Sequence, residues 1–169
     1  SAVLRVQRFF RKQPGLADFR VDWVCCEVGI RETVTIQGKK TVSVQDYEAG
    51  TRYEDAVCYA FYQIDEHLND GEGINQRQLR RNVLPTIPRG ALLPAGSRFL
   101  VVAGRCVASD REANSAMRVE CPCMAMGQAA GAMGALAAQT GVDPEELPLE
   151  DVHALLRTHG AIVPGDVRA

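Results

Sequence analysis

Apolar residues at the start of the chain recur with the period of a helix. Val3, Val6 and Phe10 fall on one face, and Pro14-Gly15 closes the segment. The pattern predicts a short amphipathic helix. Its other face is basic, and four charges on such a helix are more typical of a solvated face than of a ligand patch, so we assign them no function.

Alternation replaces this helical period in the next segments. Residues 19–25 place an apolar side chain at every second position, which is typical of a half-buried strand. The β-branched runs 33–36 and 41–44 flank four residues that include Gly38. This arrangement predicts a β-hairpin.

Residues 69–97 contain Pro85, Pro88 and Pro94 and several glycines and asparagines. Such a composition predicts loop or extended surface chain. A loop of this length within a compact domain is usually functional or packed against another surface.

The second half of the chain carries the strongest signals. Residues 99–104, FLVVAG, are continuously apolar, which is typical of a strand covered on both faces, as central parallel strands are. A helix is predicted from about Pro122, near its first position, to Gly141 just beyond its end. After a capped turn at 143–146, a second apolar stripe predicts a closing helix that stops at Gly160, in which the histidines are expected to be structural.

Three glycines, Gly127, Gly131 and Gly134, share one face of the long predicted helix. Each lowers helix stability by about 1 kcal/mol relative to alanine, which suggests that another backbone must approach closely. Tight packing of the helix on a sheet is the favoured interpretation. A membrane-spanning helix is disfavoured because the run is short and contains Gln128.

Composition narrows the class of protein further. The 169 residues are 46% hydrophobic and 24% charged, with a net charge of -2, as in a soluble globular domain. This charge balance argues against nucleic-acid and anionic-membrane partners. The six cysteines lack metal-ligand or disulfide-scaffold spacing, so we expect no metal site and a reduced, cytoplasmic protein.

A buried strand that ends at Gly104-Arg105, followed by a helix with free first-turn N–H groups, is a recurrent way to meet an anionic or electron-rich part of a cofactor. The amino-acid identities in this segment are more informative than the order of its elements. Residues 100–141, with an AGR strand end, an RV step and the helix motif C-x-x-M-G-Q-A-A-G, closely resemble the C-terminal flavin-binding segment of a family of FAD-dependent oxidoreductases. GIRET at 29–33 and IDEH at 64–67 are similar to that family's G-x-R-E-[ST] and D-x-H elements.

This resemblance runs along nearly the whole chain and implies an α+β fold. Residues 1–97 would belong to a β-containing substrate domain, and residues 98–169 would supply the last strand and helix of a Rossmann-like FAD-binding domain. The family's G-x-G-x-x-G fingerprint, which cradles the FAD pyrophosphate, is absent here. We therefore expect the C-terminal portion of a longer enzyme, which by itself is inactive and does not bind FAD, and whose partner is the N-terminal dinucleotide-binding half.

The implied function is hydride transfer between a small organic substrate and FAD. The alternative is a non-catalytic interaction or assembly domain of the same descent. Without its other half, the predicted strand and glycine-faced helix would leave an edge or an apolar patch uncovered, so we also expect self-association into a homo-oligomer.

The resemblance also implies site residues. Donors near the pyrimidine edge of the flavin stabilise its reduced form, and Glu120 departs from the neutral residue expected there. Cys121 and Cys123 are interpreted as packing residues, because a disulfide across one residue is strained. The positions matched to the cofactor side are Gly104, Arg105, Arg118, Val119, Pro122, Cys123, Met124 and Ala125.

On the substrate side, the candidate catalytic residues are His67 and Arg31. The unperturbed pKa of histidine, near neutrality, suits His67 to exchange a proton with the substrate. A plain surface histidine in an acidic segment is the alternative for His67. For Arg31 the alternative is a structural ion pair with the adjacent Glu32.

Overall fold

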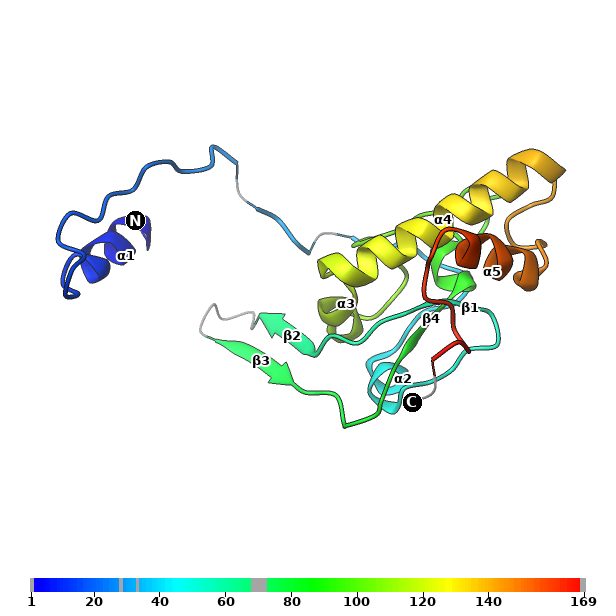
Figure 1. Ribbon diagram of the computed structural model, residues 1–169, viewed down its shortest axis with the longest axis horizontal. Helices are drawn as coiled ribbons and strands as arrows, with labels where there is room; N and C mark the ends of the chain where they lie inside the picture. Colours follow the sequence, from blue (N-terminus) through cyan, green and yellow to red (C-terminus); the bar gives the residue numbers. More distant parts are fainter. Residues whose placement is uncertain (1, 28, 33, 68–72, 168–169) are drawn as a thin grey trace. The chain divides into compact units, whose positions relative to one another are not determined.

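A computed structural model describes residues 2–27, 29–32, 34–67 and 73–167 (Figure 1). The chain divides into two compact units, Ser1–Ile30 and Arg31–Ala169. Segments from both sides of position 97 pack within the second unit, and their division between a substrate and a cofactor domain stays a prediction.

The first unit contains one helix, α1 (Ala2–Phe10), as its apolar spacing predicts. The rings of Phe10 and Phe19 lie 4.9 Å apart, which brings the chain back against the end of the helix. The strand predicted over residues 19–25 is wrong. No described residue pairs with this segment as a strand, and the Trp23 side chain is 75% exposed. Alternation produces a strand only where a neighbouring strand accepts its hydrogen bonds and a surface covers one face.

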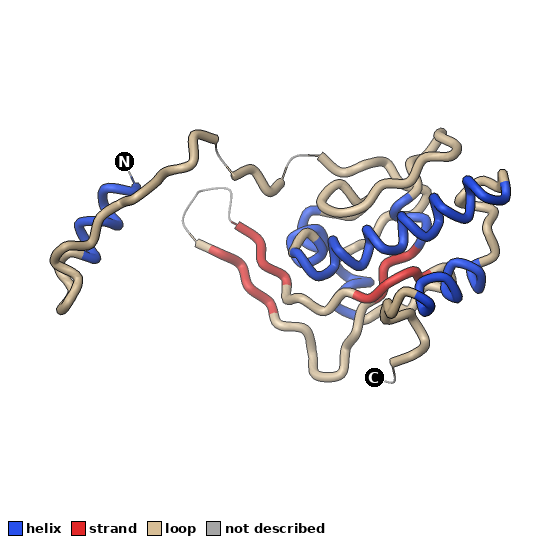
Figure 2. The backbone as a smooth tube through the Cα atoms, turned by 45° about the horizontal axis from the view of Figure 1, so that its top comes forward, coloured by secondary structure: helices blue, strands red, loops and turns tan. Residues whose placement is uncertain are grey.

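The second unit contains two separate antiparallel strand pairs, drawn in red in Figure 2. Strand β1 (Ala56–Tyr59) pairs with β4 (Thr86–Pro88), with an irregular register between Ala56 and Cys58. Strand β2 (Ile64–His67) pairs with β3 (Ile74–Arg77) in continuous register. The short 3-10 helix η1 (Arg89–Leu92) follows β4.

Four α-helices complete the described part of this unit, and their ends have identifiable causes. Helix α2 (Val44–Ala49) begins at the Ser43 cap, and α3 (Arg111–Met117) begins at Asp110, whose carboxylate accepts a hydrogen bond from the Ala113 amide. The long helix α4 (Glu120–Thr140) ends at Gly141, where φ is 72°. Helix α5 is Leu149–Thr158.

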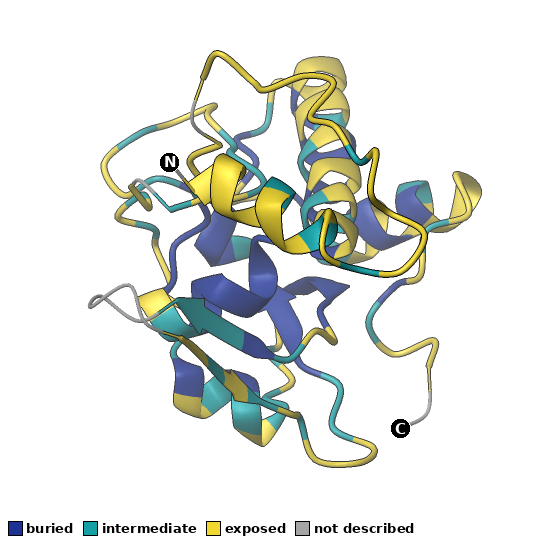
Figure 3. Cartoon of the chain, turned by 90° about the vertical axis from the view of Figure 1, so that its left-hand side faces the viewer, coloured by how far each residue is buried: buried dark blue, intermediate teal, exposed yellow. Residues whose placement is uncertain are grey.

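The core lies between the inner side of α4, the β1–β4 pair and α5, as the dark blue regions of Figure 3 show. Met126 and Met133 of α4 are fully buried, as are Ile87 of β4 and Val152 of α5. The outer side of α4 is exposed, and nothing lies within 4 Å of a Cβ built at Gly127, Gly131 or Gly134. The tight packing expected at this glycine face is therefore not made by the described residues.

The predicted hairpin over residues 33–44 is wrong, with residue 33 itself outside the described residues. Gly38 forms an antiparallel bridge with Pro94, and Val42 forms a parallel bridge with Ser109. A Cβ at Gly38 would lie 2.5 Å from the Ala108 Cβ, so glycine permits a close approach there. Ile36 of the first run donates its N–H to the Cys106 carbonyl at 2.9 Å, so both β-branched runs contact segments distant in sequence.

Two further expectations need correction. Residues 99–104 form no strand: Phe99 is 57% exposed, and the Val102 N–H donates to the Leu92 carbonyl of η1 at 2.9 Å. A covered central strand needs neighbouring strands on both edges, and the described residues do not supply them. The proline-rich stretch predicted as loop contains β3, β4 and η1 in its described part. Pro88 is compatible with β4 because it stands at the end of the strand, where a missing N–H is tolerated.

Candidate functional site

A polar pocket of about 480 Å³ forms where the GIRET element and the residue after Gly104 meet the start of α3 within the second unit. Asp110 fixes this meeting point, because its carboxylate accepts hydrogen bonds from the Ala113 amide at 2.8 Å and from the Val44 amide at 2.6 Å. The starts of α2 and α3 are thereby joined. The pocket is lined by Glu32, Val34, Thr35, Arg105, Ser109, Arg111 and Asn114.

Asn114 organises the floor of this pocket. It is buried, and its side-chain amide donates to the Arg105 carbonyl at 3.2 Å and to Ser109 Oγ at 3.0 Å. The turn that follows Gly104 is therefore attached to α3. This places Arg105, predicted on the cofactor side, in the same pocket as Glu32 of the GIRET element.

The β2–β3 strand pair is anchored beside the pocket by four polar contacts. The Asp65 amide donates to Ser115 Oγ at 3.0 Å, and Arg118 donates to the Asp65 carbonyl at 3.2 Å. Arg77 of β3 pairs with Glu48 at 2.8 Å and with Glu112 at 2.5 Å, which raises the pKa of Arg77. These contacts fix the strand that ends at His67.

Arg31 and His67, the two predicted catalytic residues, are in direct contact. Arg31 Nη2 lies 2.8 Å from His67 Nε2. Because a guanidinium only donates hydrogen bonds, Nε2 is the acceptor, and the ring in this arrangement is neutral and carries its proton on Nδ1. Arg111 Nη2 donates to the His67 carbonyl at 2.9 Å, which holds the backbone beneath the ring. His67 is half-buried at the end of a strand, unlike a histidine in a free surface loop.

Glu32 pairs with two other arginines and not with Arg31. Its Oε1 lies 2.9 Å from Arg118 Nη2, and its Oε2 accepts from Arg111 Nε at 3.4 Å. The Arg118 side chain is only 5% exposed, and its Nε has no hydrogen-bond partner among the described residues. The adjacent pair Arg31-Glu32 is therefore not a self-contained ion pair, since each member has its own partners.

The AGR end and the start of α4 lie side by side. Gly104 has a φ of +86°, a conformation that favours glycine, and a Cβ built there would lie 3.9 Å from Cys123 Sγ. Helix α4 begins at Glu120, two residues before the expected Pro122, and its N-cap residue Val119 makes no side-chain capping hydrogen bond. The first-turn amides of α4 are thus free of a side-chain cap.

Two thiols in this part of the fold, Cys58 and Cys123, are poor nucleophiles. Burial raises the pKa of Cys58 to about 12. Burial also raises the pKa of Cys123, an effect that the charge of Arg105 opposes. Because the thiolate is the reactive form, Cys58 and Cys123 suit packing better than redox chemistry.

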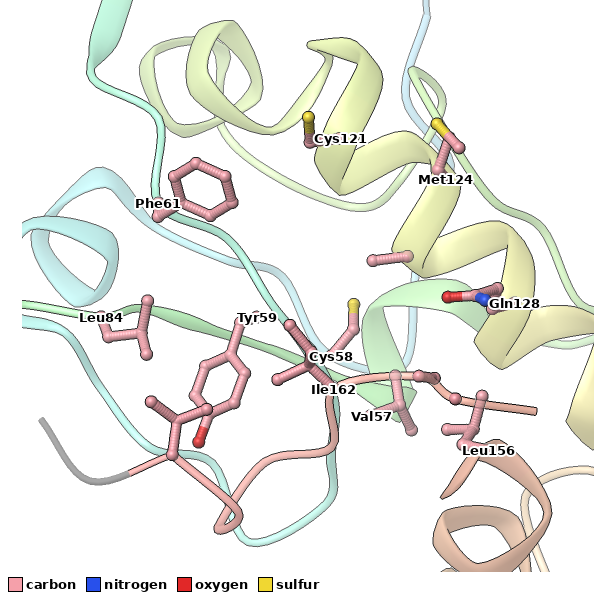
Figure 4. Close-up of a pocket in the computed structure, with 14 residues that line it drawn as sticks. Val57, Cys58, Tyr59, Phe61, Leu84, Cys121, Met124, Gln128, Leu156 and Ile162 are labelled. Atoms are coloured by element: carbon pink, nitrogen blue, oxygen red, sulfur yellow. The ribbon is translucent and has the colours of Figure 1, made fainter. Parts of the chain in front are cut away.

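A second, apolar pocket of about 550 Å³ lies between β1, the start of α4 and the residues after α5 (Figure 4). Met124 and Ala125, predicted on the cofactor side, line it together with Cys58 and Phe61. The Met124 side chain is 64% exposed and Phe61 is 61% exposed, so this pocket opens to the surface. Of the predicted cofactor residues, Arg105 lines the polar pocket, and Met124 and Ala125 line the apolar one.

Comparison with protein families gives a match to the family model described as FAD dependent oxidoreductase, over residues 1–156. The chain belongs to this family. No curated protein and no solved structure matches it significantly. None of the helices in the described parts of the chain is both long and apolar enough to span a membrane.

For this member of the FAD-dependent oxidoreductase family, sequence reasoning missed Arg111, Ser109 and Asn114. Asp110 followed by a helical segment is an N-cap signal that could have located α3. Nothing in the local sequence indicates that Arg111 reaches both Glu32 and His67, because these partners are 79 and 44 residues away.

Proposed function

We propose that this chain supplies the substrate-side groups and part of the flavin site of an enzyme that transfers a hydride between a small organic substrate and FAD. The observation that carries the proposal is the direct Arg31–His67 contact beside a pocket that also contains Arg105. Three motifs distant in sequence are thus assembled around one cluster of polar groups. FAD, when bound, supplies the hydride-accepting centre.

The residues at the start of α4 fit the cofactor role proposed for them. The helix N-terminus lacks a side-chain cap, so the N–H groups of its first turn remain suited to a partner that carries negative charge. Glu120 opposes this effect with its own charge. We assign the cofactor side to Gly104, Arg105, Val119, Pro122, Cys123, Met124 and Ala125.

Arg118 has a more indirect place in this proposal. Its guanidinium is engaged by Glu32 and by the Asp65 carbonyl, on the substrate side of the cluster. The residue joins the GIRET element to the segment immediately before α4. Its influence on a bound flavin would therefore act through the field of a buried charge.

A dinucleotide-binding half that carries the G-x-G-x-x-G motif is the proposed partner of the exposed apolar surface. Phe99 and Leu100 are 57% and 49% exposed, and the glycine face of α4 is open. Parallel strands on either side of residues 99–104 would supply the cover that a continuous apolar run requires. In the absence of that half, a second copy of the chain is the proposed cover.

The visible spectrum tests the cofactor part of the proposal. We expect the chain, purified with added FAD, to be colourless, and a polypeptide that joins it to the dinucleotide-binding half to retain flavin absorbance. Anaerobic addition of small alcohols or amines to that polypeptide should bleach the absorbance when a substrate is present.

Two histidine variants test the substrate side. His67→Gln should slow flavin reduction by about 100-fold or more, as expected for loss of a general base. His159→Gln, at an exposed histidine that follows α5, should leave the rate unchanged. Equal rates in the two variants would remove His67 from the mechanism.

A further inference from the structure

The contact between Arg31 and His67 blocks the atom that proton transfer requires. In the neutral ring, Nδ1 carries the proton and Nε2 holds the basic lone pair. Arg31 donates to that same Nε2 at 2.8 Å. His67 therefore accepts a proton at Nε2 only after Arg31 has moved away.

We propose that the substrate of this site carries a carboxylate, and that this carboxylate draws Arg31 away from His67 and so frees Nε2 to act as the base. The proposal rests on the oxidoreductase function above and specifies its substrate class. Arg31 is then the specificity-determining residue, and His67 is the proton acceptor.

A carboxylate is the ligand that matches the donor at this position. Guanidinium groups bind carboxylates with two parallel charge-assisted hydrogen bonds, whereas an imidazole nitrogen accepts one bond and carries no charge. The Arg31 side chain belongs to an exposed residue, so a ligand in solution can reach it. A carboxylate thus competes for Arg31 with a weaker partner.

The neighbouring acids are held by other groups. Arg118 and Arg111 pair with Glu32, and Arg111 also lies 3.4 Å from Glu66. Asp65 Oδ1 accepts a hydrogen bond from Gln76 at 3.2 Å. No ion pair joins Arg31 to an acidic residue in the part of the chain that the structure describes. The acidic side chains near His67 are thus engaged with other groups, and none of them draws Arg31 away from the imidazole.

The backbone is anchored at both ends of the Arg31–His67 contact, and the Arg31 side chain is the part that can move. The His67 backbone is fixed by Arg111 through its carbonyl, and Arg111 lines the polar pocket. Glu32 is fixed by two arginines, so the chain next to Arg31 is also anchored. The flexible part is the Arg31 side chain, which can turn toward a ligand while the imidazole stays in place.

The reaction step balances with these groups. The substrate is a carboxylate that bears an alcohol or an amine. Its O–H or N–H proton passes to Nε2, which makes the ring an imidazolium. The C–H bond breaks, and its hydrogen leaves with both electrons to FAD, so the substrate is oxidised to a carbonyl or an imine while the flavin is reduced.

Nuclear magnetic resonance of the isotope-labelled chain tests the release of His67 without any flavin. Above neutral pH, where imidazoles are uncharged, the Nε2 nitrogen resonance shows whether its lone pair accepts a hydrogen bond, and His67→Gln assigns the signal. Benzoate should shift the His67 Nε2 nitrogen resonance downfield in a saturable manner, because Nε2 loses the Arg31 hydrogen bond and keeps its lone pair. Benzamide, its neutral counterpart, should not.

Variants of Arg31 supply the control. Arg31→Met should give the downfield Nε2 resonance from the start, and it should weaken benzoate binding about tenfold or more. Arg31→Lys should restore part of the affinity. Arg157→Met removes a cation on α5 that pairs with Asp166, and this variant should behave as the unchanged chain.

The outcomes separate this inference from the function on which it rests. An unmoved His67 resonance, an equal response to benzamide, or unchanged benzoate binding in Arg31→Met each overturns the carboxylate proposal, even if the joined polypeptide reduces flavin. A benzoate response that depends on Arg31 supports it, even if flavin reduction then fails and the oxidoreductase function is lost.

Discussion

The two sides of the site are built in opposite ways. Around His67, charged side chains from β2, α3 and the GIRET element hold one another at distances of 2.8 to 3.4 Å, and Arg118 is nearly buried. Around the outer side of α4, the apolar pocket and the glycine face are open to solvent. The ion pairs of the polar side are made among this chain's own residues, whereas the apolar side presents a surface that the described residues leave uncovered.

This contrast follows from the chemistry of the residues. Charges that leave water need specific partners, and the chain supplies these within a few ångströms. Apolar surface needs only cover, without directional bonds, and any well-shaped partner can provide it. The substrate side is therefore expected to keep its geometry in the chain alone, while the cofactor side depends on a partner.

The largest expected effect compares the two sides of α4. Met133→Ala removes a fully buried side chain from the core and should lower the free energy of unfolding by about 2–5 kcal/mol. Met124→Ala, at a side chain that is 64% exposed, should change it by less than about 0.5 kcal/mol. Chemical denaturation measures both. A comparable loss in both variants would mean that the outer side of α4 is already covered, for example by a second copy.

The polar side is tested at its most buried charge. Arg118→Met leaves Glu32 with Arg111 alone, and we expect a loss of about 2–3 kcal/mol in the free energy of unfolding, below the value for a fully buried pair because Glu32 is 31% exposed. The matched variant Arg157→Met breaks an exposed pair and should cost less than about 1 kcal/mol.

A double-mutant cycle isolates this coupling. If Glu32→Gln abolishes most of the effect of Arg118→Met, the two side chains act together. Additive effects would show that Arg118 is stabilised mainly through the Asp65 carbonyl.

Sequence periodicity predicted the helices better than the strands for a physical reason. Helices α1, α4 and α5 make their hydrogen bonds within one segment, so local spacing and the stop at Gly141 locate them. The strand predicted at residues 19–25 and the hairpin at 33–44 needed partners that local sequence does not specify, and both predictions were wrong. Whether residues 99–104 form a strand likewise depends on neighbouring parallel strands, which the local sequence does not specify.

The motifs of the candidate site could be predicted from the sequence, but the contacts between their residues could not. The resemblance named Arg31 and His67 separately, and the structure brings them within 2.8 Å of each other. It also named Arg118 as a flavin contact, while its observed partners are Glu32 and Asp65; a direct role toward flavin stays a prediction. Arg111 joins these groups through contacts that only the fold creates.

The pH dependence of stability tests the contacts through which Asp143 holds the start of residues 99–104. Hydrogen bonds from the Glu145 and Phe99 amides, together with Arg98, lower the pKa of Asp143. A carboxylate with a lowered pKa stabilises the fold above its unfolded value, near pH 4, and this contribution is lost as the pH falls through the lower folded value. Asp143→Asn should therefore reduce stability at neutral pH and flatten its decline below about pH 4. Asp151→Asn, on the exposed side of α5, is the control, and an equally steep acid decline in Asp143→Asn would contradict the assignment.

The smallest expected effect concerns the open glycine face. Gly131→Ala places a methyl group where nothing lies within 4 Å, and alanine favours the helix, so the chain should gain about 0.5–1 kcal/mol in the free energy of unfolding. Gly38→Ala should instead lose stability, because its Cβ would lie 2.5 Å from that of Ala108. In the polypeptide joined to the dinucleotide-binding half, the sign for Gly131 should reverse. A backbone that approaches this face would meet the added methyl group, and flavin retention should fall. If Gly131→Ala stabilises the joined polypeptide as much as the chain alone, the glycine face is not where that half packs.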